Sequence, residues 1–231
     1  MTNLKGFLLS NLKYSDHDAI LNFYTENFGY QTFFAKGIYA SKTLKKSLLF
    51  PLNELEIFTQ NSLNETGKLP NIQKLELVKS GYDGNPDIGS ILMFAADFLN
   101  QILKRENASE LIYREISNFM LQLSKSDFSS HIYLVFNMLK HNGWLPLKSN
   151  EIFLNPETGS FTDAENHYLF NKGISKIWKI FLNSEHPHQI KLKRKERNAF
   201  LESLMLYYKL HFTNFKYPES LEILKILYQS E

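Results

Sequence analysis

The chain has 231 residues, 43% of them hydrophobic and 22% charged, so it can bury the core of one large domain or of two modest ones. It contains no cysteine, which excludes disulfides, thiolate nucleophiles and every cysteine-based zinc site. The net charge of +2 excludes little, because the ends lean only slightly basic and the middle slightly acidic. The apolar run at residues 7–9 is too short for a signal sequence, and no stretch approaches the roughly 18 apolar residues of a membrane span. We therefore expect a cytoplasmic protein without membrane contact.

The first 80 residues predict short β-strands. Apolar and polar side chains alternate with a period of two, which suits half-buried strands. Strands are expected at residues 7–12, 19–24, 31–35, 54–58 and 75–78. In the second of these, Ala19, Leu21 and Phe23 would face one side, and Asn22 and Tyr24 the other. Gly29 lies in a predicted hairpin turn, where it is free to take a positive φ angle. Five or six short strands in residues 1–80 indicate a small barrel or sandwich.

Residues 80–86, Ser-Gly-Tyr-Asp-Gly-Asn-Pro, end this region, and the apolar period then changes to 3.6 residues. The sequence predicts a helical C-terminal domain over residues 81–231, with an irregular insert near 144–162 that can hold a short hairpin. Helical stripes are expected at residues 91–102, 112–123, 132–139, 163–182, 200–211 and 221–228. Gly143 is the expected C′ residue of the third stripe. Amphipathic packing explains these stripes without a ligand.

Motifs of known catalytic sites are missing from the sequence. It has no phosphate-binding glycine motif, no zinc-protease motif and no nucleophile elbow. His186 and His188 form the only close histidine pair, and an exposed loop explains them better than a metal site. Asp16 and Asp18 are expected to face solvent rather than to act in acid–base chemistry. We expect no enzyme, no metal and no cofactor, and an enzyme of unrecognised type is the least favoured hypothesis.

Lysines are concentrated in residues 35–46, which we call the lysine-rich loop. Lys36, Lys42, Lys45 and Lys46 fall within eleven positions, with Tyr39 between them. Lysine ammonium groups neutralise backbone phosphates and release counterions, and an aromatic ring can stack on an unpaired base. The loop is therefore a candidate nucleic-acid contact. A solvated loop without a partner is the alternative, and composition by itself favours it.

A second concentration of charge, the C-terminal basic cluster, runs into a predicted helix start. It consists of Lys191, Lys193, Arg194, Lys195 and Arg197. The helix macrodipole disfavours extra positive charge at that end. An anionic partner would explain the cluster, and so would simple exposure with screening by salt, so both interpretations remain open.

Several motifs resemble the RecO family of bacterial recombination mediators and DNA repair proteins. In the N-terminal domain they are Tyr14-x-Asp16-x-Asp18-x-Ile20, the pair Tyr24-Thr25 followed by Tyr30, Ala35-Lys36-Gly37, and Ser41-Lys42. Residues 197–224 are similar to the closing helices of RecO proteins from one bacterial branch. The resemblance spans essentially the whole chain and is strongest at its two ends.

The resemblance implies an α+β protein, with an N-terminal OB-fold β-barrel over residues 1–80 followed by helices. It also implies a mediator that binds single- and double-stranded DNA and anneals complementary strands. With RecR, such proteins help to load RecA onto DNA coated by the single-stranded DNA-binding protein, whose acidic C-terminal tail is a further expected partner. The lysines of the lysine-rich loop would contact phosphates, Tyr39 would stack, and the C-terminal basic cluster would extend the DNA path. The alternative is an OB-fold protein-interaction module with little DNA affinity.

Many members of that family carry a four-cysteine zinc element in the C-terminal domain. The corresponding region of this chain, about residues 148–170, has no cysteine. The resemblance therefore implies a version without zinc, in which ordinary packing holds this region. The expected packing residues are Phe153, Leu154, Phe161, Tyr168 and Phe170.

Overall fold

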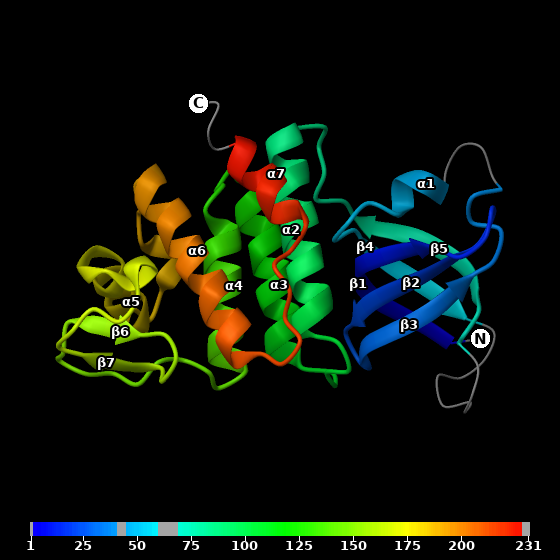
Figure 1. Ribbon diagram of the computed structural model, residues 1–231. Coiled ribbons are helices and arrows are strands. Elements are labelled where there is room, and N and C mark those ends of the chain that lie inside the picture. The colour runs from blue at the N-terminus through cyan, green and yellow to red at the C-terminus, as the bar shows by residue number, and fades with distance from the viewer. Residues whose placement is uncertain (1, 41–44, 60–68, 228–231) are drawn as a thin grey trace. The chain divides into compact units, whose positions relative to one another are not determined.

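The computed structural model describes residues 2–40, 45–59 and 69–227 (Figure 1). Contacts within the chain divide it into two compact units. The first unit extends to Met120 and includes Pro218–Leu224, and the second contains Leu121–Tyr217 and the chain from Lys225. Strands form the start of the first unit and helices dominate the rest, which confirms the predicted α+β class. In the described part of the chain, no helix combines the length and hydropathy that a membrane crossing requires.

Five strands form the first sheet, and each pairs antiparallel with its neighbours in the order β3-β2-β1-β4-β5 (Figure 1). Their bounds are β1 (Thr2–Lys13), β2 (Ala19–Thr25), β3 (Gly29–Ala35), β4 (Glu54–Thr59) and β5 (Ile72–Lys79). The edge strands approach each other at a parallel bridge between Phe34 and Asn71. The N–H of Phe34 donates there to the carbonyl of Pro70 at 2.9 Å. A five-stranded sheet that curls until its edges touch is the partly open barrel of the OB type.

The barrel core follows the predicted period of two. Ala19, Leu21 and Phe23 are buried on the inner face of β2, and Phe23 packs edge-on against Phe33 of β3. The short helix α1 (Lys45–Leu48) begins with the last two residues of the lysine-rich loop and contributes the half-buried Leu48 to this core. The alternation of apolar and polar residues in the sequence was therefore sufficient to identify the residues of β2 that face the barrel core.

Two polar side chains outside the barrel core are also buried, and one of them, Tyr24, was expected on the opposite side of β2 from the core residues. Tyr24 is fully buried, and its hydroxyl donates to the carbonyl of Asn107 (3.0 Å) and accepts from the N–H of Ser109 (3.1 Å). Glu54 is only 8% exposed, and one carboxylate oxygen accepts from the Tyr113 hydroxyl at 2.8 Å. The period of two fails here because helices of the same unit cover part of the outer face.

Those helices are α2 (Pro86–Ile102), which packs against β1, and α3 (Glu110–Ser124). Asn85 caps α2 by accepting from the N–H of Asp87, and Pro86 occupies the first turn, where its missing N–H has no cost. The predicted stripes of both helices are buried. The beginning of α7 (Ser220–Leu227) is tied to α2 by the N–H of Glu219, which donates to Asp97 at 3.0 Å.

The second unit is mainly helical. Its elements are α4 (Ser130–His141), β6 (Phe153–Asn155), β7 (Ser160–Thr162), the 3-10 helix η1 (Tyr168–Phe170), α5 (Lys172–Asn183), the 3-10 helix η2 (Pro187–Gln189) and α6 (Arg194–His211). Trp178 is buried at the centre, and its indole N–H donates to the Ser203 hydroxyl at 3.0 Å. Gly143 has φ +72° directly after the C-cap of α4, and the N–H of Trp144 donates back to Leu139. This arrangement confirms Gly143 as the predicted C′ residue.

The insert contains the short hairpin β6–β7, but the helix predicted over residues 163–182 is wrong in its first half. The α-helix begins only at Lys172. Asn171 is its N-cap and accepts from the N–H groups of Gly173 and Ile174. Before it, the Thr162 hydroxyl donates to the carbonyl of Ala164, and such local side-chain bonds compete with helix formation.

At Gly29, the backbone of the barrel packs directly against the connection between α2 and α3. Its φ is +65°, and a Cβ atom there would lie 2.4–2.5 Å from backbone atoms of Glu106, Asn107 and Ala108. The next residue, Tyr30, donates its N–H to the carbonyl of Glu106 at 2.9 Å. Only glycine allows the two backbones to approach this closely.

Replacing Gly29 by Ala should therefore lower the free energy of unfolding by more than the usual cost of a left-handed alanine, which is about 1–2 kcal/mol. Gly37→Ala is the matched control, because Gly37 has φ +63° and open space where its Cβ would lie. Urea unfolding of the two variants measures the difference. Equal losses in both would contradict a close backbone contact at Gly29.

Candidate nucleic-acid interface

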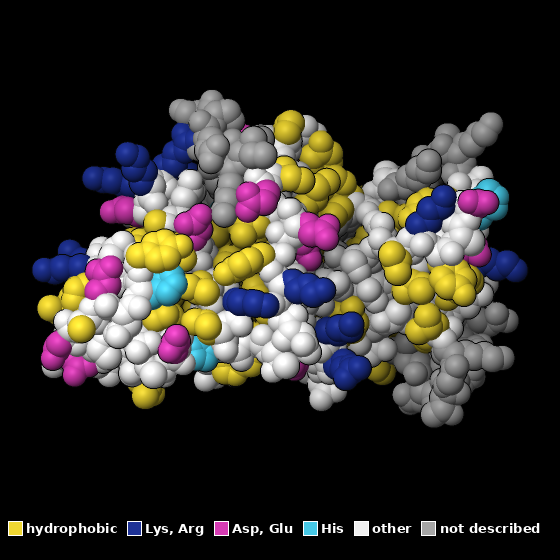
Figure 2. Space-filling model, in the orientation of Figure 1, with side chains coloured by type: hydrophobic (Ala, Val, Ile, Leu, Met, Phe, Trp, Pro, Cys, Tyr) yellow, Lys and Arg dark blue, Asp and Glu magenta, His cyan; other side chains and the backbone are white. Residues whose placement is uncertain are grey.

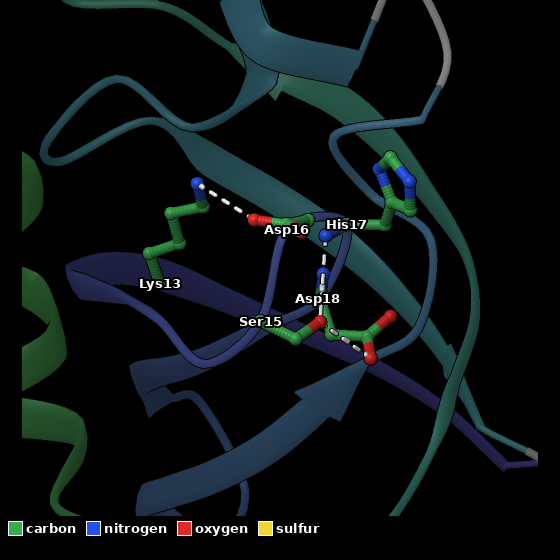
Figure 3. Close-up of polar contacts among 5 residues, drawn as sticks. All are labelled: Lys13, Ser15, Asp16, His17 and Asp18. Atoms are coloured by element: carbon green, nitrogen blue, oxygen red, sulfur yellow. Dashed lines mark hydrogen bonds and ion pairs between the residues drawn. The ribbon is translucent and has the colours of Figure 1, made fainter.

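The turn between β1 and β2 is held by its own side chains (Figure 3). The Ser15 hydroxyl donates to the Asp18 carboxylate at 2.9 Å and accepts from the backbone N–H of Asp18 at 3.2 Å. Asp16 is exposed and lies 3.8 Å from the Lys13 ammonium group. The expectation that both aspartates simply face solvent therefore holds for Asp16, whereas Asp18 has a structural role.

Asp18 also connects this turn to the lysine-rich loop. Its second carboxylate oxygen accepts from the N–H of Gly37 at 2.7 Å, and the carbonyl of His17 accepts from the N–H of Tyr39 at 3.0 Å. The Gly37 N–H, followed by the Ser15 hydroxyl, holds the pKa of Asp18 below its ordinary value, and the charge of Lys36 adds to the effect. The carboxylate therefore fixes the start of the loop beside the β1–β2 turn.

The structure places the predicted residues of the lysine-rich loop as follows. Lys36 is exposed directly after β3, and Tyr39 is half-buried against the barrel core, which reduces the ring face it can offer to a base. Lys45 and Lys46 begin α1, and Lys42 lies outside the described residues. Lys36 and Tyr39 are thus brought together at one end of the barrel.

A surface that sequence reasoning missed crosses β1, β2 and β3 on the outside of the barrel. Leu12 pairs with Ile20, and Ile20 pairs with Phe34, so their side chains share one row. Tyr14 continues this row, with its ring edge-on to that of Phe34 at 5.7 Å between centroids. We call these four residues the outer apolar row. Leu12 is 62% exposed and Tyr14 67% exposed, and Figure 2 shows hydrophobic side chains gathered over β2 and β3.

The neighbouring row on the same strands is polar and bonded to α2. The Asn22 amide donates to the Ser10 hydroxyl at 2.7 Å and accepts from the Thr32 hydroxyl at 2.7 Å. The hydroxyls of Ser10 and Tyr30 both donate to the Asn100 side chain, at 3.3 and 2.9 Å. Helix α2 therefore occupies this part of the outer face. In the outer apolar row beside it, Leu12 and Tyr14 stay exposed, and Ile20 and Phe34 are half-buried. An exposed apolar patch of this kind marks a binding surface more often than chance.

The C-terminal basic cluster lies at the start of α6 in the second unit. Lys191, Lys193 and Lys195 are exposed, whereas Arg194 and Arg197 are half-buried. Arg197 donates to the Ser129 hydroxyl at 3.3 Å, which gives it a packing role. Glu196 accepts from the N–H of Lys193 at 2.9 Å and supplies negative charge at the helix N-terminus. Three cations of the cluster are therefore available to an anionic partner.

The residues of the insert do not fit a zinc ion. The chain has no cysteine, and in the described residues no group of His, Asp and Glu is arranged to hold a metal. Leu154, Phe161 and Phe170 are buried, as predicted, and Phe153 is half-buried. Tyr168 is 73% exposed, so its predicted packing role is wrong, because it lies on the outer side of the short helix η1.

Comparison with known proteins finds similarity to one family. The sequence profile described as "Recombination protein O N terminal" matches residues 1–81, which contain all five strands of the barrel. The DNA repair protein RecO of Christiangramia forsetii is 27% identical over 99% of both chains. The DNA repair protein RecO of Phocaeicola vulgatus is 27% identical over 96% of this chain and 97% of its own. The chain is similar to DNA repair proteins RecO over nearly its whole length, and its first 81 residues match the RecO N-terminal profile.

The similarity to RecO proteins extends beyond the barrel. The DNA repair protein RecO of Flavobacterium psychrophilum is 23% identical over 96% of both chains, so the similarity includes the helices as well. The outer apolar row and Lys36 both lie in the part that the RecO N-terminal profile matches.

Substituting Asp18 tests whether it positions the lysine-rich loop. Asp18→Ala should accelerate amide hydrogen exchange at Gly37, and Asp18→Asn should do so less, because an amide oxygen can still accept the bond. In the unsubstituted protein, the protection should persist at neutral pH. It should be lost as the pH falls through the lowered folded pKa of Asp18, since the carboxylate accepts these bonds best when ionised.

Asp16→Asn is the matched control, because its exposed carboxylate accepts no bond from the loop in the described residues. It should leave exchange at Gly37 unchanged. Protection of Gly37 that survives in Asp18→Ala would refute the positioning role.

Proposed function

We propose that this chain acts in DNA repair as a non-catalytic recombination mediator, and that its barrel binds DNA through the outer apolar row and the lysine-rich loop. The observation that carries this proposal is the juxtaposition of exposed aromatic and aliphatic side chains with Lys36 on an OB-type barrel. Three of the relatives are named as DNA repair proteins, which supports the same role.

The proposed binding mode uses two kinds of contact. Tyr14 and Phe34 present ring surface to unpaired bases, and stacking of this kind is tolerant of sequence because every base has a π-face. Lys36, with Lys42, Lys45 and Lys46, neutralises phosphates and releases counterions. The exposed lysines of the C-terminal basic cluster are a separate proposed phosphate contact. No step of such binding requires a catalytic residue.

The wider role follows from this mode of binding. A protein that holds bases by stacking can present one strand to its complement, so we propose that the chain binds single- and double-stranded DNA and anneals complementary strands. We further propose that it acts with RecR and the acidic tail of the single-stranded DNA-binding protein to help load RecA. Residues 1–80 are the proposed DNA-binding domain, and residues 81–231 the proposed helical domain.

Replacing Lys36, Lys42, Lys45 and Lys46 together by Ala should weaken binding of single-stranded DNA by at least about tenfold at low salt. The dependence of log K on log salt should also flatten, by about 0.7 for each phosphate contact that is lost. Fluorescence anisotropy at two or more salt concentrations measures both quantities.

The control for this quadruple variant is Lys125→Ala with Lys148→Ala, two exposed lysines of the second unit. An unchanged affinity in the quadruple variant would reject the lysine-rich loop as the contact. If the unsubstituted protein binds no DNA but retains RecR in a pull-down, the protein-interaction module becomes the better description.

Replacing Tyr14 and Phe34 by Ala should weaken single-stranded DNA binding while leaving double-stranded DNA binding nearly unchanged, because paired bases cannot stack on these rings. Stacking contributes about 1–3 kcal/mol per base, so we expect a loss of roughly fivefold to more than a hundredfold. The salt dependence should not change, since no phosphate contact is removed. Tyr168→Ala, an exposed tyrosine of the second unit, is the matched control. Equal losses on both forms of DNA would contradict base stacking.

A further inference from the structure

The seam of the barrel is only partly closed. In the described residues, the two edges of the sheet are joined by one parallel bridge, between Phe34 of β3 and Asn71 just before β5, and β3 and β5 are not paired neighbours in the sheet. A pocket of about 120 Å³ opens at this place. It is lined by the end of β3 and the following turn, by α1 and by the start of β5: Ala35, Lys36, Ile38, Leu48, Ile72, Gln73, Lys74 and Leu75.

Five of the eight residues that line this seam pocket are apolar, and the other three are Lys36, Gln73 and Lys74. Ala35 and Ile38 are buried beneath it, and Leu48, Ile72 and Leu75 are half-buried at its sides. An apolar cavity of about 150 Å³ holds one benzene ring, so the seam pocket has the size of a single flat ring rather than of a longer ligand. Its walls offer contact to ring faces.

The rim of the pocket carries positive charge on two sides. Lys36 is exposed at the end of β3, and Lys74 is exposed on β5. The Lys74 ammonium group pairs with Glu76 and lies 5.5 Å from the centre of the Phe58 ring, so it is held near the strand. An apolar slot between two cations complements a ring that has an anionic group on each side.

The seam pocket is also continuous with the outer apolar row. Phe34, the last member of that row, forms the bridge at the seam and directly precedes Ala35 of the pocket wall. A strand that crosses the row toward Lys36 would therefore reach the pocket mouth without a gap.

We propose that the seam pocket receives one unstacked base of a bound single strand, with the neighbouring phosphates at Lys36 and Lys74. This inference rests on the proposed DNA binding and adds to it a specific subsite. A base extracted from its stack exchanges base–base contact for contact with Ile72, Leu48 and Leu75. The pocket would then fix the position of one nucleotide while the outer apolar row holds its neighbours less specifically.

Filling the pocket tests this subsite. Leu75→Trp, or Leu48→Trp from the opposite wall, should reduce affinity for a thymidine oligonucleotide about tenfold, which corresponds to the loss of one stacked base. Affinity for an abasic strand of equal length should change less than twofold, because its phosphates are intact. Anisotropy titrations of both strands give the comparison, and thermal melting confirms that each variant is folded.

The matched control is Leu77→Trp, an exposed position on the same strand that does not line the pocket, and it should leave both affinities unchanged. Equal effects of pocket filling on both strands, or no effect, would overturn the inference while leaving DNA binding in place. Failure of the unsubstituted protein to bind either strand would instead refute the proposed function. If filling impairs only the binding of an acidic peptide that ends in an apolar residue, the occupant is a peptide and the base subsite is wrong.

Discussion

The contact between the β2–β3 hairpin and the α2–α3 connection determines what the barrel can expose. Gly29 lets two backbones meet where any side chain would separate them, and the Tyr24 hydroxyl bonds to Asn107 and Ser109 from a fully buried position. Burial raises the pKa of Tyr24 to about 12, so the hydroxyl stays protonated and can donate. With the hairpin end fixed there, α2 reaches Asn22 and Thr32 through Asn100 and Ser10, and the outer apolar row begins where this cover ends.

The opposite end of the same strands is organised by one carboxylate. Asp18 accepts from Gly37 and from Ser15, so the β1–β2 turn and the start of the lysine-rich loop behave as one structural element. Because each bond is to an ionised acceptor, each is stronger than its neutral equivalent. The exposed ring of Tyr14 and the charge of Lys36 are consequently held on the same end of the barrel. Both depend on a residue that itself contacts no partner in the proposed function.

The sequence predicted the structural features that follow from a local residue pattern. It missed the features that depend on strand register or on burial by distant parts of the chain. The period of two identified Ala19, Leu21 and Phe23, and the 3.6 period with Gly143 located the helices and one of their ends. Tyr24 was misplaced because its partners, Asn107 and Ser109, are more than eighty residues away. Lysine spacing predicted Lys36 as a contact, but Tyr14 and Phe34 meet only through the register of three strands, which no spacing reveals. The helix predicted from residue 163 failed because Asn171 caps a later start.

The weak overall charge is consistent with DNA binding because the proposed interface does not depend on a strong field. A net charge of +2 gives little long-range attraction, and salt screens it within about 10 Å. Affinity must then come from contacts at short range, and the rings of Tyr14 and Phe34 would supply contacts that salt does not weaken. Ring contacts without base-edge hydrogen bonds do not discriminate sequence, so a strand held this way keeps its pairing edges available to a complement. For a protein proposed to anneal strands, moderate charge combined with stacking therefore fits better than a strongly basic surface, which would bind paired and unpaired DNA alike.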